Sequence, residues 1–153
     1  MLDVRSIRKD FPIFNNGDSP LIYLDSASTT QKPQSVIDTI TSYYNSYTAN
    51  IHRALYTIGE KATDEYEKVR EKVKKFLNVP NTHTVVFTGG TTESINLVAH
   101  AWGIKFLEEE NNVIVSEMEH HSNLVPWQMV TEQKGASLKF IPLTDDGTLN
   151  LKE

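Results

Sequence analysis

Two short stretches of the sequence carry residue types that bind anions and flat ligands. The first places two glycines before two threonines, over Gly89 to Thr92, where an apolar stretch meets a helical pattern. Glycines let the backbone approach a ligand closely, and the threonines add hydroxyl groups beside N–H groups that lack partners inside the helix. This pattern predicts a phosphate site, although an ordinary helix start uses the same residues. The carboxylate of Glu93 would repel a phosphate there unless it points away.

The second stretch holds two adjacent histidines, His120 and His121, which follow the next apolar segment. An imidazole at this place is able to stack on a flat ligand. Two histidines that bond only within their own loop would give the same pattern. Neighbouring side chains usually point in different directions, and no acid or third imidazole stands at the spacing of a zinc site. The sequence therefore predicts no metal site.

Two earlier loops also carry candidate binding residues. The segment Asp25–Ser28 has small side chains, which leave backbone N–H groups accessible after a short apolar segment. His52 and Arg53 place an imidazole beside a guanidinium, and a guanidinium binds carboxylates through paired donors. A loop arginine that pairs with a surface acid would look the same. Neither the Gly-Lys-Ser/Thr nor the Gly-x-Gly-x-x-Gly pattern is present, so a nucleotide site is not expected.

Composition excludes several classes of function. The chain has 153 residues, a net charge of −5 and no block of basic residues, which argues against nucleic acid and anionic membrane as partners. It contains no cysteine, so disulfides and thiol nucleophiles are excluded for this chain. The first ten residues do not form a signal peptide, and no apolar run is long enough to cross a bilayer. We therefore expect a cytoplasmic protein.

Secondary-structure patterns place both candidate stretches at the ends of strands. Strands and helices alternate in the second half of the chain, which predicts an α/β fold with a parallel-type sheet and crossover helices. Ligands of such sheets bind beyond the carboxyl ends of the strands. The chain stops where another helix is expected, so the predicted sheet is incomplete. The expected strands are residues 21–24, 84–88, 112–116 and 137–143, and the expected helices are a short one before Asp10, one after Pro33, 59–77, 91–107 and 125–134.

Motifs in collinear order along nearly the whole chain resemble the Suf-type cysteine desulfurases. This family belongs to the class V aminotransferase group of pyridoxal-phosphate enzymes, so the resemblance implies the fold-type I architecture. Residues 1–20 would be an N-terminal segment, and residues 21–153 would start the cofactor-binding large domain. The most specific motifs are Met118–His121 and Val125–Gln128. The others are Tyr23–Ala27, Gln31–Pro33, Asn50–Arg53, Gly90–Glu93 and Ile95–Leu97.

The resemblance also implies roles for individual residues. Thr91 and Thr92 would hold the phosphate of pyridoxal 5′-phosphate, and His120 would stack on its pyridine ring. Ala27, His52 and Arg53 would border the substrate pocket. In this family the cofactor ring is an electron sink, L-cysteine is converted to L-alanine, and the sulfur leaves as a persulfide on a catalytic cysteine. A sulfur-acceptor protein then collects it for iron–sulfur cluster assembly, and the enzymes usually form homodimers.

Members of the family are much longer than this chain. The resemblance implies that the Schiff-base lysine and the catalytic cysteine are missing, so no catalytic residue is expected here and the fragment alone should be inactive. Two alternatives remain: a truncated paralogue that serves as a partner or assembly subunit, and another class V enzyme such as a selenocysteine lyase or an aminotransferase. The second arises because the sequence departs from the family pattern at Ala54 and Tyr56, and it also departs from that pattern at Ser28 and Gly89.

Overall fold

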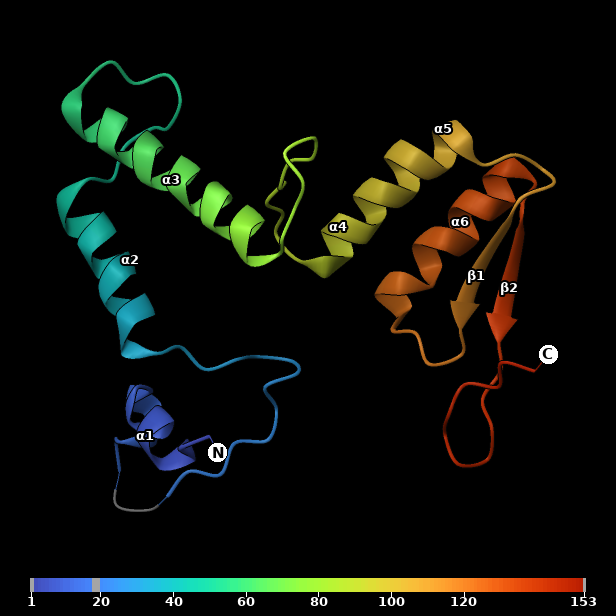
Figure 1. Ribbon diagram of the computed structural model, residues 1–153, viewed down its shortest axis with the longest axis horizontal. Coiled ribbons are helices and arrows are strands. Elements are labelled where there is room, and N and C mark those ends of the chain that lie inside the picture. Colours follow the sequence, from blue (N-terminus) through green and yellow to red (C-terminus); the bar gives the residue numbers. More distant parts are fainter. Residues whose placement is uncertain (1, 18–19, 153) are drawn as a thin grey trace. The chain divides into compact units, whose positions relative to one another are not determined.

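The computed structural model describes residues 2–17 and 20–152, so a small part of the expected N-terminal segment lies outside it. The chain divides into two compact units, Met1–Val85 and Val86–Glu153, which are described separately (Figure 1). Within the described residues, no helix combines the length and apolar character needed to span a membrane.

The first unit contains the helices that the periodicity of its apolar residues predicts. The side chain of Asp3 caps the first helix by accepting a hydrogen bond from the Ser6 N–H at 3.1 Å. The second helix begins directly after Pro33, and the third begins two residues before the expected position. The elements are α1 (Val4–Lys9), the 3₁₀ turn η1 (Pro12–Phe14), α2 (Gln34–Ser46) and α3 (Thr57–Phe76).

Two of the predicted strands are wrong. Residues 21–24 and 84–88 are irregular, and neither segment pairs with a strand among the described residues. An extended segment becomes a strand only when a neighbour accepts and donates its ladder hydrogen bonds. The carbonyl of Val85 instead accepts a hydrogen bond from the guanidinium of Arg70, and the side chain of Val86 is 63% exposed.

The second unit confirms the α/β expectation. Its two strands, β1 and β2, pair in parallel, from Asn112 opposite Ser137 to Ser116 opposite Ile141. The predicted helix 91–107 is a continuous helical run to Phe106, with a π-helical turn in the middle that the sequence did not predict. The elements are α4 (Thr91–Val98), η2 (Ala99–Gly103), α5 (Ile104–Phe106), β1 (Asn112–Ser116), the 3₁₀ turn η3 (His121–Asn123), α6 (Val125–Lys134) and β2 (Ser137–Ile141).

Helix α6 forms the centre of the second unit. It connects the two parallel strands and lies between them and the run from α4 to α5 (Figure 1). Local signals set its bounds, since Pro126 stands in its first turn and Gly135 ends it with φ of +69°. Its Val130 is 1% exposed and packs with the buried Ala99 and Leu107. This cluster is the hydrophobic core that supports the loops on either side of α6.

The π-helical turn packs closely on α6 at Gly103. A Cβ atom added there would lie 2.8 Å from the Cγ1 of Val130, which is too close for two carbon atoms. We therefore expect Gly103→Val to destabilise the chain by about 1–3 kcal/mol through overpacking. Urea unfolding would measure this as a lower midpoint. Ala101→Val, on the exposed side of the same turn, is the control, and equal midpoints for the two variants would contradict the close packing.

Candidate functional site

The first candidate stretch forms the start of α4. Thr91 and Thr92 are the first two residues of this helix, and both are exposed. Gly90 precedes them with φ of +159° and ψ of 179°, a backbone conformation that residues with a Cβ atom rarely adopt. Apart from Gly90 itself and its two chain neighbours, no residue has an atom within 4 Å of the place where a Cβ of Gly90 would be. The turn therefore leaves open space in front of the helix start.

The hydrogen-bond donors at this helix start have no acceptor among the described residues. Among the described residues, none accepts a hydrogen bond from the backbone N–H of Thr91, Thr92 or Glu93. The hydroxyls of both threonines are likewise unbonded within this described part of the chain. Helix N-termini favour anions through such N–H groups and through the helix dipole. The donor set fits a phosphate group.

Residues on both sides of the threonines hold the turn in place. The hydroxyl of Thr88 lies 2.7 Å from that of Ser94, and it donates to the carbonyl of Gly90 at 3.1 Å. The carboxylate of Glu93 accepts the N–H of Gly89 at 2.5 Å. Sequence reasoning gave Thr88 and Ser94 no role. The contact of Glu93 could have been predicted from its position as the third residue of the helix. An acidic side chain there commonly accepts a hydrogen bond from a backbone N–H just before the helix.

The second candidate stretch places His120 directly before η3. Its Nδ1 accepts a hydrogen bond from the N–H of Ser122 at 3.1 Å and lies 2.9 Å from the Ser122 hydroxyl. Because Nδ1 is an acceptor, the neutral ring carries its proton on Nε2. The rings of His120 and His121 are perpendicular, as expected for neighbours that point in different directions. His120 is exposed, so its ring is accessible to a ligand.

A chain of hydrogen bonds ties the histidine loop to the core. The carboxylate of Glu119 accepts bonds from Ser116 and Asn123, each at 2.8 Å, and Asn123 accepts one from the indole of Trp127 at 3.1 Å. These bonds, that of Asn123 first and that of Ser116 second, lower the pKa of Glu119. Trp127 packs against the core cluster. The sequence analysis did not predict that these residues anchor the histidine loop. Glu119, Asn123 and Trp127 are spaced four residues apart, and this spacing could have indicated that their side chains contact one another.

The structure brings Thr91, Thr92 and His120 into one unit. Helix α4 begins with the two threonines and packs against η3, which His120 precedes. The N-terminus of α4 and the loop after β1 therefore lie close together in the second unit (Figure 1). The loop with His120 lies beyond the carboxyl end of β1, which is where α/β proteins bind ligands. The N-terminus of α4 follows the irregular residues 84–88.

Ala27, by contrast, lies in the first unit. Its loop is closed on itself, because the hydroxyl of Tyr23 donates to the carbonyls of Asp25 and Thr29 at 3.2 and 2.5 Å. Ala27 is exposed at the outside of this loop. No hydrogen bond or ion pair within the described residues joins this loop to His52 or Arg53.

His52 contacts three residues of α3, and Arg53 is the next residue in the chain. The backbone of His52 has φ of +71° and donates a hydrogen bond to the hydroxyl of Thr63 at 3.0 Å. Its ring meets Tyr66 edge-on, and its Nε2 lies 3.8 Å from a carboxylate oxygen of Glu67. Arg53 is exposed, and its guanidinium bonds to no other residue in the described part of the chain. The arginine is therefore available to an anionic group.

The departure from the family pattern at Ala54 does not strain the backbone. Outside glycine, only His52 and Asn78 have positive φ among the described residues, so Ala54 adopts an ordinary conformation. Its Cβ lies close to the buried backbone of Gly59 in α3. A Cβ added to Gly59 would be only 2.2 Å away, so this pair requires one residue to be glycine.

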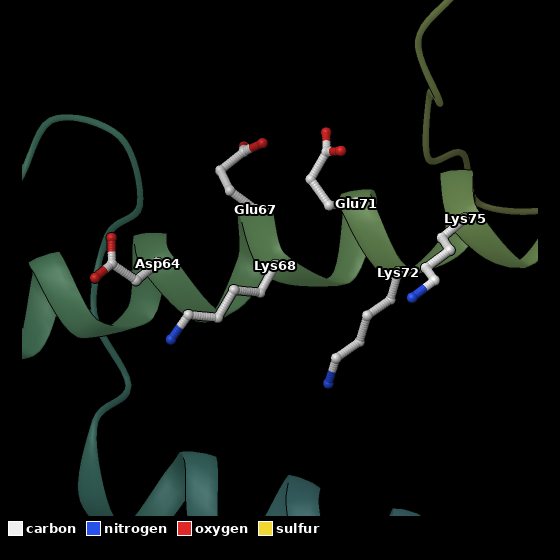
Figure 2. Close-up of a pocket in the computed structure, with 6 residues that line it drawn as sticks. All are labelled: Asp64, Glu67, Lys68, Glu71, Lys72 and Lys75. Carbon is white, nitrogen blue, oxygen red and sulfur yellow. The ribbon is translucent and has the colours of Figure 1, made fainter. Parts of the chain in front are cut away.

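A shallow hollow on α3 is lined by charged residues of both signs. Figure 2 shows the carboxylates of Glu67 and Glu71 above the helix and the ammonium groups of Lys68 and Lys72 below it. The ion pairs on this helix join residues three positions apart, such as Lys68 with Glu65 at 2.9 Å and Lys74 with Glu71 at 3.7 Å. Mixed, solvated charges of this kind favour no single ligand. The lining residues are Asp64, Glu67, Lys68, Glu71, Lys72 and Lys75.

Metal ligation has no support in the described residues, which contain no group of three or more histidine, aspartate or glutamate side chains able to hold a metal ion. The candidate site offers the hydrogen-bond donors at the start of α4 and the imidazole of His120. Together these suit a ligand that joins a phosphate to a flat ring.

Comparison with known proteins identifies the class to which this fold and site belong. The model of the family described as aminotransferase class-V matches residues 22–153. The chain therefore belongs to the class V aminotransferase family, whose cysteine desulfurases and aminotransferases depend on pyridoxal phosphate.

Proteins similar to this chain include cysteine desulfurases. The chain is 48% identical over 154 residues to a probable cysteine desulfurase of Staphylococcus aureus, and the match covers 99% of this chain and 37% of that protein. The apo cysteine desulfurase of Thermococcus onnurineus is 35% identical, with a TM-score of 0.87 over 99% of this chain and 36% of that one. The cysteine desulfurase CsdA of Escherichia coli is 40% identical, with a TM-score of 0.76 over 95% and 36%.

These likenesses confirm the fold that the motifs implied. The chain has the α/β architecture with a parallel sheet found in pyridoxal-phosphate enzymes of fold-type I. It spans somewhat more than a third of the length of these relatives.

Proposed function

We propose that this chain is part of a Suf-type cysteine desulfurase that acts with pyridoxal 5′-phosphate. The complete enzyme would convert L-cysteine to L-alanine and pass the sulfur to an acceptor protein for iron–sulfur cluster assembly. It would act as a homodimer in the cytoplasm. The collinear motifs and the identity to probable cysteine desulfurases support this proposal. Residues 21–153 would begin the cofactor-binding domain, after an N-terminal segment of residues 1–20.

The observation that carries the proposal is the set of donors at the start of α4. The N–H groups and hydroxyls of Thr91 and Thr92 have no acceptor among the described residues, and the space around a Cβ added to the preceding Gly90 is open. A phosphate accepts several such bonds at once and gains from the helix dipole. These two residues would therefore bind the phosphate of the cofactor.

His120 would fix the orientation of the cofactor ring. Ser122 holds its Nδ1, so the plane of the imidazole is set before a ligand binds. Stacking of the imidazole on the pyridine ring adds about 0.5–1.5 kcal/mol beyond the area buried. Ala27, His52 and Arg53 would border the substrate pocket, where Arg53 has a guanidinium suited to a carboxylate. The bound cofactor supplies an electron sink for the bond that breaks in the substrate.

A titration of the isotope-labelled chain, followed by NMR, would test this assignment. Pyridoxal 5′-phosphate and inorganic phosphate are both expected to shift the amide signals of Thr91 and Thr92. Only the compound with a ring should also shift the ring signals of His120. The amide of Lys72 in α3 is the internal control, because phosphate attracted merely to surface lysines would act there. Shifts confined to α3 would refute the phosphate site.

A further inference from the structure

Glu93 lies in the phosphate site but does not face the space that a phosphate would occupy. Its carboxylate reaches back over the turn and accepts the N–H of Gly89 at 2.5 Å. A charged acceptor makes this hydrogen bond stronger than one between neutral groups. A Cβ atom at position 89 would lie 2.9 Å from the same carboxylate oxygen, so the absence of a side chain at Gly89 lets Glu93 come this close.

A second contact closes the same turn from the other side. The hydroxyls of Thr88 and Ser94 lie 2.7 Å apart and link the residue before the glycines to the first turn of α4. The Thr88 hydroxyl also reaches the carbonyl of Gly90, which in turn accepts the N–H of Ser94 at 3.1 Å. These contacts tie the turn to the first residues of α4, while the N–H groups and hydroxyls of Thr91 and Thr92 have no acceptor among the described residues.

We propose that Glu93 and the hydroxyl pair of Thr88 and Ser94 are positioning groups for the phosphate site, an inference that rests on the proposed function. They hold Gly89 and Gly90 in the conformation that turns the donors of α4 outward. Gly90 has φ of +159°, so its backbone would leave this conformation easily without such bonds. Binding to a donor set that is already oriented loses less conformational entropy than binding to a mobile one.

Removal of the Glu93 side chain changes ligand binding in opposite directions if Glu93 positions the turn or if it only repels the phosphate. If Glu93 only repels phosphate, its removal should tighten binding. If it positions the turn, Glu93→Ala should weaken the binding of pyridoxal 5′-phosphate about tenfold, although a negative charge is lost. Glu93→Gln keeps an oxygen acceptor for Gly89 and should stay within about threefold of the unchanged chain. Titration by NMR would give these dissociation constants, with Glu110→Ala as the control for the loss of one exposed acid in the same unit.

Hydrogen exchange at Gly89 tests the positioning role without any ligand. Glu93→Ala should make the Gly89 amide exchange at least about tenfold faster, whereas Glu93→Gln should preserve most of its protection.

Thr88→Val provides an independent second variant, which should weaken the binding of pyridoxal 5′-phosphate because the hydroxyl is lost. Thr88→Ser keeps the hydroxyl and should bind as the unchanged chain does. Equal or tighter binding by Glu93→Ala, or unchanged exchange at Gly89, would overturn the inference. Failure of the unchanged chain to bind pyridoxal 5′-phosphate or inorganic phosphate would instead overturn the proposed function.

Discussion

Replacement of Thr91 and Thr92 together by valine is expected to weaken the binding of pyridoxal 5′-phosphate at least tenfold, which is about 1.4 kcal/mol. Valine keeps the branched shape of threonine, so the start of α4 should be preserved. The two hydroxyl donors are lost, and the site then retains only backbone N–H groups for the phosphate. The dissociation constant would be measured by NMR titration or by cofactor absorbance after dialysis.

Two controls make this result specific to the phosphate. Pyridoxal, which lacks the phosphate, should bind the double variant as it binds the unchanged chain. Thr41→Val, at an exposed position of α2, makes the same chemical change outside the site and should leave binding unaltered. An unchanged dissociation constant in a folded double variant would contradict the assignment of the two threonines.

The 153-residue chain alone is expected to be catalytically inactive. We expect no alanine or sulfide from L-cysteine and no covalent adduct of the cofactor at a single lysine. The chain has no cysteine to carry a persulfide. The second unit has lysines only on α5, on the last turn of α6, on β2 and near the end of the chain, and none in the segments that form the site. They are Lys105, Lys134, Lys139 and Lys152.

Reduction with borohydride in the presence of pyridoxal 5′-phosphate would check this expectation. Peptide mass spectrometry should find label spread thinly over several exposed lysines. The same treatment of a complete cysteine desulfurase is the positive control, where one lysine should dominate. A stoichiometric adduct at one lysine of this chain, or alanine formed from cysteine, would show that the chain is catalytic by itself.

The helices of this protein could be predicted because their signals are local. The apolar residues of α3 recur at helical spacing, and α6 has a proline in its first turn and a left-handed glycine at its end. The bounds of α6 match the prediction, Val125 to Lys134. The π-helical turn over Ala99–Gly103 could not be predicted, since it accompanies the close approach of Gly103 to Val130 on another helix.

The strands could not all be predicted, because a strand needs a pairing partner and the local sequence does not show whether one is present. Residues 112–116 and 137–141 became strands because α6 brings them side by side in parallel register. Residues 84–88 have an equally apolar pattern but no pairing strand among the described residues. The sequence predicted an extended conformation there, and only the neighbours of a segment decide whether it forms a ladder.

The sequence by itself located the candidate binding residues, which are two threonines at a helix start and an imidazole after a strand, and it showed that the chain has no cysteine. It also determined the family, because motifs in collinear order persist along nearly the whole chain. Tertiary structure alone decided how these residues are oriented. The carboxylate of Glu93 bonds to the N–H of Gly89, and Ser122 bonds to the Nδ1 of His120. The physical reason is that a side chain's hydrogen-bond partner depends on which groups folding brings within about 3 Å, and sequence order does not specify that distance.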